Sequence, residues 1–145
     1  MNAFATTDVG IERNVNQDYV YAKLDDIGCL PNLFIVADGM GGHKAGEIAS
    51  SLVVTEPGKR FSELSSIGTK EDAVIWLKEI IDEINVKILK YAEEHIDANG
   101  LGTTCVCSIL TDDFLLFGNV GDSSGFVEKK GKLYKVTKDH TLVNR

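Results

Sequence analysis

Hydrophobic positions in the first third of this 145-residue chain follow the pattern of strands. Residues 3–9 and 19–23 are short runs that mix apolar, aromatic and β-branched side chains, which favour extended backbone. Residues 34–37 are four apolar side chains in a row, typical of a buried strand. The carboxylate of Asp38 follows directly, so the sequence predicts an acidic residue at the C-terminal end of this strand.

The middle of the chain changes to helical spacing. Apolar residues at 45, 48, 49, 52 and 53 form one stripe of a helix, which Pro57 is expected to end. Thr69 followed by Asp72 resembles a capping box, and apolar residues recur from there to position 92. The sequence therefore predicts a second, long amphipathic helix of about six turns that closes near Gly100.

From residue 103 the strand pattern returns. Runs rich in β-forming residues at 103–110, 114–120, 125–128 and 133–137 are separated by turn-forming residues, which predicts an antiparallel meander. Strands, then two helices, then further strands predict an α+β domain in which helices cover a sheet face.

Composition and charge narrow the classes of function. Hydrophobic residues at 43% and charged ones at 26% suit one globular domain over residues 1–145. A net charge of -7 argues against nucleic-acid partners, because binding a phosphate backbone needs a basic face. The N-terminus lacks a signal-peptide pattern, and no apolar run approaches membrane-spanning length, so we expect a cytoplasmic protein with no membrane partner. Cys29, Cys105 and Cys107 match no metal motif and are expected to be reduced, packed thiols.

The acidic end of the buried strand is the best candidate for chemistry. Glycines at 39, 41 and 42 let the backbone after Asp38 turn sharply and bring carbonyl oxygens close to whatever its carboxylate binds. Hard divalent cations take such oxygen donors. A turn in which Asp38 merely caps the next helix is the alternative. Upstream, Arg13 lies five residues before Asp18, which would place a phosphate-pairing guanidinium near a second carboxylate.

Six motifs, in order along nearly the whole chain, resemble the metal-dependent protein serine/threonine phosphatases of the 2C class (the PPM family) in their bacterial form. They are Asp8-Val9-Gly10 through Arg13, Asn16-Gln17-Asp18, Val36-Ala37-Asp38-Gly39-Met40-Gly41-Gly42, Gly102-Thr103-Thr104, Asn119-Val120-Gly121-Asp122-Ser123 and Thr137-Lys138-Asp139-His140-Thr141-Leu142-Val143. The resemblance implies the fold of that family, an antiparallel β-sandwich with flanking helices.

The resemblance also implies a reaction, the hydrolysis of phosphoserine and phosphothreonine in a phosphorylated protein. By it, Asp38 bridges two Mn²⁺ or Mg²⁺ ions, Gly39 offers its carbonyl to one of them, and Asp18 belongs to the same site. Arg13 would grip the substrate phosphate, and Asp122 resembles the ligand of a looser third metal. A hydroxide that bridges the two metals attacks phosphorus, so no covalent enzyme intermediate is needed. A Ser/Thr kinase or its targets are the implied partners.

One departure from the family concerns the C-terminal part. There the family carries further metal aspartates, in Ser-Asp-Gly and Asp-Asn motifs, and strands that complete the sandwich, whereas this sequence stops at Arg145. We therefore expect a C-terminally incomplete domain with half of the metal site. Its exposed sheet edges predict an oligomer or else a marginally stable chain. The rival function is a non-catalytic pseudophosphatase fragment that binds phosphoproteins or oligomerises, and metal content distinguishes the two.

Overall fold

The computed structural model describes residues 2–23, 32–41, 45–95 and 100–141. Its elements are β1 (Asp18–Lys23), β2 (Asn32–Met40), α1 (Ala45–Ser62), α2 (Lys70–Glu94), β3 (Gly102–Thr103), β4 (Cys105–Leu110), β5 (Leu115–Val120), β6 (Phe126–Lys129) and β7 (Lys132–Lys135). The main sheet has the order β1-β2-β4-β5, with β3 paired to the end of β2, and β6 and β7 form a separate two-stranded sheet. Every pairing is antiparallel, so the predicted α+β class is confirmed.

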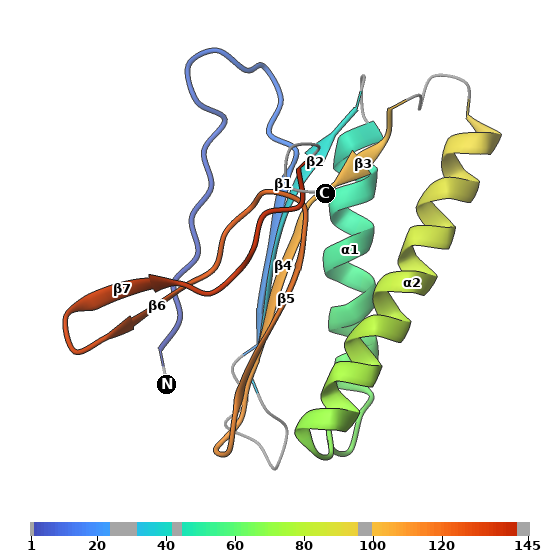
Figure 1. Ribbon diagram of the computed structural model, residues 1–145. Helices are drawn as coiled ribbons and strands as arrows, with labels where there is room; N and C mark the ends of the chain where they lie inside the picture. The colour runs from blue at the N-terminus through green and yellow to red at the C-terminus, as the bar shows by residue number, and fades with distance from the viewer. Residues whose placement is uncertain (1, 24–31, 42–44, 96–99, 142–145) are drawn as a thin grey trace.

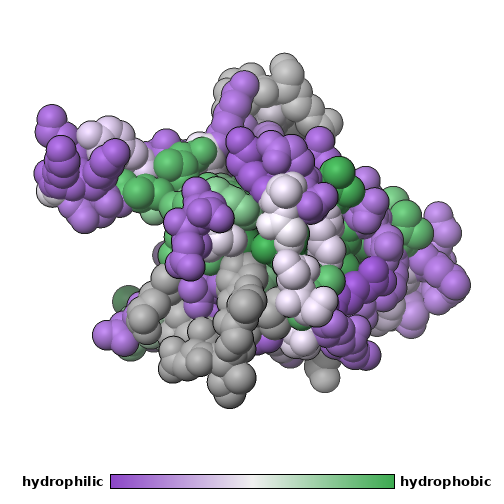
Figure 2. Space-filling view, turned by 90° about the horizontal axis from the view of Figure 1, so that it is seen from below, coloured by the Kyte–Doolittle hydropathy of each residue, from purple (hydrophilic) through white to green (hydrophobic). Residues whose placement is uncertain are grey.

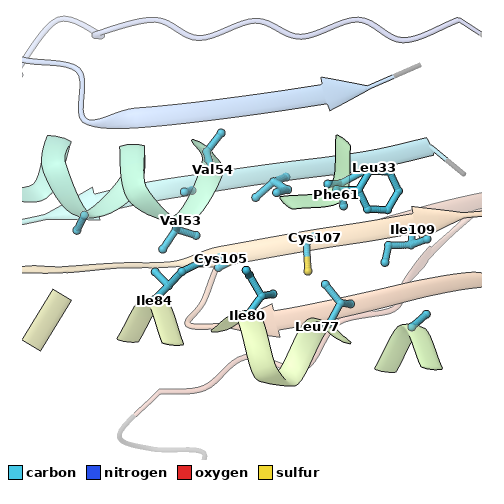
Figure 3. Close-up of a cluster of buried hydrophobic side chains, with 14 of the residues drawn as sticks. Leu33, Val53, Val54, Phe61, Leu77, Ile80, Ile84, Cys105, Cys107 and Ile109 are labelled. Carbon is cyan, nitrogen blue, oxygen red and sulfur yellow. The ribbon is translucent and has the colours of Figure 1, made fainter. Parts of the chain in front are cut away.

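Both helices cover one face of the main sheet (Figure 1). Alternate residues of β2 and β4 point toward the helices and are buried, as the period of two in a strand requires. Figure 3 shows this core, which contains Leu33, Val53, Val54, Phe61, Leu77, Ile80, Ile84, Cys105, Cys107 and Ile109. Cys105 and Cys107 are buried free thiols, as predicted, whereas Cys29 lies outside the described residues.

No helix of the described residues covers the opposite face of the main sheet. The N-terminal segment and the β6–β7 hairpin lie on this side (Figure 1). Val36, Asp38 and Met40 point to this face and are exposed, while their neighbours in β2 are buried. The acidic candidate of the sequence therefore projects from the open face of the sheet.

Two expectations about the strands were wrong. Residues 3–9 form no strand and are exposed, because none of the described strands lies beside them to complete a ladder. Strand β2 does not end at Asp38. It continues to Met40, because Gly39 and Met40 pair with Thr103 and Gly102 of β3.

The expected end of the first helix was also wrong. Helix α1 continues through Pro57 to Ser62, and both Pro57 and Gly58 are buried. A Cβ on Gly58 would lie 2.7 Å from the ring of Tyr21 in β1, so close packing on the sheet holds this part of the helix in place. Tertiary packing here overrides the local preference against proline.

Helix α2 confirms its predicted start. The backbone N–H of Asp72 donates to Thr69 Oγ1 at 3.2 Å, and the N–H of Thr69 donates to Asp72 Oδ2 at 2.8 Å, which completes the capping box. The helix ends at Glu94, before the predicted Gly100, and His95 caps it. Among the described residues, no helix is both long enough and apolar enough to cross a membrane.

Candidate metal and phosphate site

Asp18 and Asp38 lie directly opposite each other in neighbouring strands. Asp18 begins β1 and pairs with Asp38 of β2 in the antiparallel register, so both carboxylates leave the same face of the sheet. Like charges in such a pair repel each other and destabilise the sheet. Two carboxylates held together in this way suggest a role other than stability.

Four separate segments bring charged side chains to a hollow around this pair. Asp8 and Arg13 come from the N-terminal segment, Asp18 and Asp38 from the paired strands, and Asp122 from the loop after β5. Gly39, Met40, Gly41 and Thr104 complete the lining together with Val9, Val15, Asn16 and Gln17. The structure thus brings together every site residue named from the sequence, and it adds Asp8.

The charges of the hollow act on Asp38. Partial burial raises the pKa of its carboxyl group, and the nearby carboxylate of Asp18 raises this pKa further. Asp122 acts in the same direction, whereas the guanidinium of Arg13 lowers the pKa. The site therefore concentrates negative charge that a bound cation would relieve.

The carbonyl of Gln17 joins the two strands to helix α1. It accepts a hydrogen bond from the backbone N–H of Gly39 at 3.1 Å and another from Ser50 Oγ at 2.6 Å. Ser50 is completely buried. A Cβ on Gly39 would lie 2.1 Å from the carbonyl oxygen of Gly46, so the start of α1 packs directly on the backbone beside Asp38. Helix α1 thereby fixes the positions of Asp18 and Asp38.

The loop that carries Asp122 is fixed to a segment further along the chain. Asn119 Nδ2 donates to the carbonyls of Gly121 at 3.3 Å and Lys138 at 2.7 Å. The backbone N–H of His140 donates to Gly121 at 2.9 Å. These bonds bring the motifs around Asn119 and His140 together in space, a relation that the sequence alone did not reveal.

The carboxylate and carbonyl oxygens of the hollow are the type of ligand that a hard divalent cation prefers. In number they fall short, because the described parts of the chain contain no group of three Asp, Glu, His or Cys side chains placed to hold one ion. Asp18 and Asp38 are paired directly opposite each other and supply two carboxylates to such a site. Gly42 and His43, next along the chain, lie outside the described residues.

Sequence reasoning assigned no role to the residues that hold this site in place, although Gln17 and Asn119 belong to its motifs. Ser50, Gln17 and Asn119 act through hydrogen bonds to backbone carbonyls, or through their own carbonyl, and none has a side chain suited to the chemistry. One indication of Ser50 was present in the sequence, because it is a polar residue among the buried positions of the first helix. The bonds of Asn119 had no such indication, because their partners are as far as 19 positions away.

Comparison with known proteins identifies the family. The model of the family described as protein phosphatase 2C matches residues 11–142, which is most of the chain. The chain belongs to the protein phosphatase 2C family. This confirms the resemblance that the six motifs suggested.

Relatives in this family are bacterial phosphatases. The serine/threonine phosphatase stp of Listeria welshimeri is 38% identical over 99% of this chain, which covers 56% of that protein. The structure of the S. agalactiae serine/threonine phosphatase matches with a TM-score of 0.86 at 35% identity, over 96% of this chain and 56% of that one. A structure of the catalytic domain of the phosphatase PstP in complex with two manganese ions matches with a TM-score of 0.79 at 33% identity, over 94% of this chain and 55% of that one. The chain therefore has the fold of the 2C phosphatases and spans about half the length of the curated relatives it matches.

Proposed function

We propose that this chain carries the metal and phosphate site of a metal-dependent protein serine/threonine phosphatase. One observation carries the proposal: in a member of the 2C family, Asp18, Asp38, Asp122 and Arg13 line one hollow. Carboxylates alone would suit many cations, but a guanidinium beside them suits the phosphate that such cations accompany.

Each residue of the hollow has a role in this proposal. Asp38 and the opposing Asp18 would hold divalent cations, and Gly39 would add a carbonyl. Asp122, which acts electrostatically on Asp38, would hold a separate, looser ion. Bound divalent ions supply an activated water and offset the charge that develops on the phosphoryl group. The planar guanidinium of Arg13 binds two phosphate oxygens and orients the phosphorus for attack.

The names of the relatives support the choice of substrate and cofactor. Proteins named serine/threonine phosphatases support a phosphorylated serine or threonine in a protein as the substrate. The two manganese ions of the PstP structure support two Mn²⁺ or Mg²⁺ ions here, with Asp122 holding a looser third. A partner Ser/Thr kinase and a cytoplasmic location stay predictions.

A second candidate function is a non-catalytic pseudophosphatase that binds phosphoproteins. The observation in its favour is that the described residues assemble no cluster of three metal-binding side chains. Arg13 would then serve binding alone, and the hollow would bind a phosphorylated segment without hydrolysing it.

We also propose that this chain, when alone, associates with a second copy of itself. Strands β1 and β5 are the edges of the main sheet, and both edges of the β6–β7 sheet are unpaired among the described strands. Figure 2 shows hydrophobic surface where the projecting hairpin meets the body of the protein, and Phe126, Tyr134 and Val136 are about half exposed. Open edges and exposed apolar side chains favour pairing with another chain.

The proposed catalytic role of Asp38 is tested by the variant Asp38→Asn in Mn²⁺-dependent hydrolysis of p-nitrophenyl phosphate. We expect hydrolysis to be abolished, because a neutral amide cannot balance the cations that share this carboxylate. Asp113→Asn is the matched control, since Asp113 is an exposed residue of the β4–β5 turn. If the wild-type chain hydrolyses the substrate and Asp38→Asn hydrolyses it as well, Asp38 is not part of the mechanism. If the wild-type chain is inactive but binds phosphopeptide, the second candidate function is favoured.

A further inference from the structure

Thr104 connects two of the acidic segments of the hollow, strand β2 and the loop after β5, through its side chain. The backbone N–H of Asp38 donates to Thr104 Oγ1 at 3.0 Å, and the N–H of Thr104 donates to the carbonyl of Asp38 at 2.9 Å. The same Oγ1 lies 2.7 Å from Ser123 Oγ. Ser123 directly follows Asp122, so a single hydroxyl bridges the strand of one carboxylate and the loop of the other.

The position of Thr104 explains why a side chain makes this bond. Residue 104 separates β3 from β4, and by the register of both strands it lies opposite Asp38. A regular ladder would use the carbonyl of residue 104 as the acceptor of the Asp38 N–H, but the hydroxyl takes that place. The carbonyl instead accepts a bond from Thr103 Oγ1 at 2.9 Å. Because of this irregular pairing, the hydroxyl contacts both the backbone of β2 and the loop after β5.

The methyl group of Thr104 has a separate contact. A Cβ built on Gly121 would lie 2.8 Å from Thr104 Cγ2, so the methyl group packs closely against the backbone at the start of the loop. Gly121 has a φ of 96°, a conformation that favours glycine. The methyl group of Thr104 therefore packs on the loop, and its hydroxyl forms a hydrogen bond with Ser123 of the same loop.

We propose that Thr104 is a positioning residue whose hydroxyl, through Ser123, sets the separation between the carboxylates of Asp38 and Asp122. This rests on the proposed function, in which both carboxylates hold metal. Their negative charges repel each other, and Asp122 stands on a loop outside the sheet ladders. The bond between Thr104 and Ser123 holds that loop near β2 before any cation binds. Hydrogen bonds from neighbouring residues orient the residues that hold a metal.

Two substitutions at Thr104 separate the hydroxyl from the methyl group. Thr104→Val keeps the shape and the packing on Gly121 but removes the hydroxyl, whereas Thr104→Ser keeps the hydroxyl and removes the methyl group. Ser123→Ala removes the bridge from the other side. Thr55→Val is the control, because Thr55 Oγ1 donates within α1, to the carbonyl of Ser51, away from the hollow.

Two measurements on the 145-residue chain decide the proposal. In Mn²⁺ titrations followed by the electron paramagnetic resonance of the free ion, we expect Thr104→Val and Ser123→Ala each to weaken binding about tenfold. The double variant should lose no more than either single one, because both remove the same bridge. Thr104→Ser and Thr55→Val should stay within about twofold of the wild type. In the metal-free chain, hydrogen exchange of the Asp38 amide should accelerate in Thr104→Val and stay slow in Thr104→Ser and Ser123→Ala.

The two measurements also separate this proposal from the proposed function. Wild-type Mn²⁺ affinity retained in Thr104→Val, affinity losses that add in the double variant, or unchanged exchange at Asp38 would each overturn the positioning role. A wild-type chain that binds no Mn²⁺ would overturn the proposed function instead, and the exchange of the Asp38 amide would still decide whether the hydroxyl holds the strand.

Discussion

Replacing Gly39 by alanine should destabilise the fold, although Gly39 has an ordinary backbone conformation for a strand. The added Cβ would lie 2.1 Å from the carbonyl oxygen of Gly46, 2.6 Å from its carbonyl carbon and 2.9 Å from the carbonyl oxygen of Gln17. All three atoms belong to backbone, so no side-chain rotation relieves the contact. Strand β2 and the first turn of α1 would have to move apart by about 1.3 Å to reach an ordinary van der Waals distance of 3.4 Å.

The cost follows from what that movement disturbs. Forcing an extra methyl group into a packed interior costs about 1–3 kcal/mol, and a clash with backbone on two sides belongs at the upper end. The movement also strains the hydrogen bonds that the Gln17 carbonyl accepts from Gly39 and Ser50. We therefore expect Gly39→Ala to lower the free energy of unfolding by about 3 kcal/mol, or the melting temperature by about 10 °C.

The assay is thermal unfolding of the metal-free chain by circular dichroism, with Gly131→Ala as the control. Gly131 has a φ of 76° and open space around its Cα, so alanine there meets backbone strain without a clash. That strain costs about 1 kcal/mol. A loss in Gly39→Ala no larger than in Gly131→Ala would refute the close approach of α1 to the site.

Three further predictions concern charge, phosphate and assembly. Burial and Asp18 raise the pKa of Asp38 above its unfolded value, so the metal-free chain loses stability as the pH rises through that pKa. Asp38→Asn should therefore melt higher than the wild type at neutral pH and equally at acid pH, and a lower melting temperature at neutral pH would contradict this sign. Arg13→Ala should raise the Michaelis constant for a phosphopeptide roughly tenfold or more, and an unchanged constant would show that Arg13 does not bind the substrate phosphate. Sedimentation at micromolar concentration should find a dimer or larger species, and a sharp, stable monomer would contradict open sheet edges.

The elements with strong local signals could be predicted from the sequence. The capping box at Thr69 and the long apolar stripe after it placed the start of α2 correctly, because both depend on residues within one or two turns. The later strands were close to their true ranges for the same reason. The family motifs also named Arg13, Asp18, Asp38 and Asp122, which the fold brings to one hollow.

The errors occurred where distant packing decides the local structure. Pro57 lies inside α1 because the next residue, Gly58, packs against Tyr21 of β1. Tyr21 and Gly58 are 37 positions apart in the sequence. Strand β2 extends past Asp38 because β3, more than 60 positions later, pairs with it. Residues 3–9 have the composition of a strand but no partner strand among the described residues. A pattern of single residues does not contain these partners.

Binding of Mn²⁺ to the metal-free chain tests the central claim most directly, because it does not depend on turnover. The account predicts weak, saturable binding by the wild type, followed through the paramagnetic resonance of free Mn²⁺. Binding should be retained in Asp113→Asn and lost in Asp38→Asn, since Asp38 lines the hollow whereas Asp113 lies in the β4–β5 turn. A wild-type chain that binds no Mn²⁺, or an Asp38→Asn variant that binds it as tightly as the wild type, would contradict a metal site at this end of the sheet.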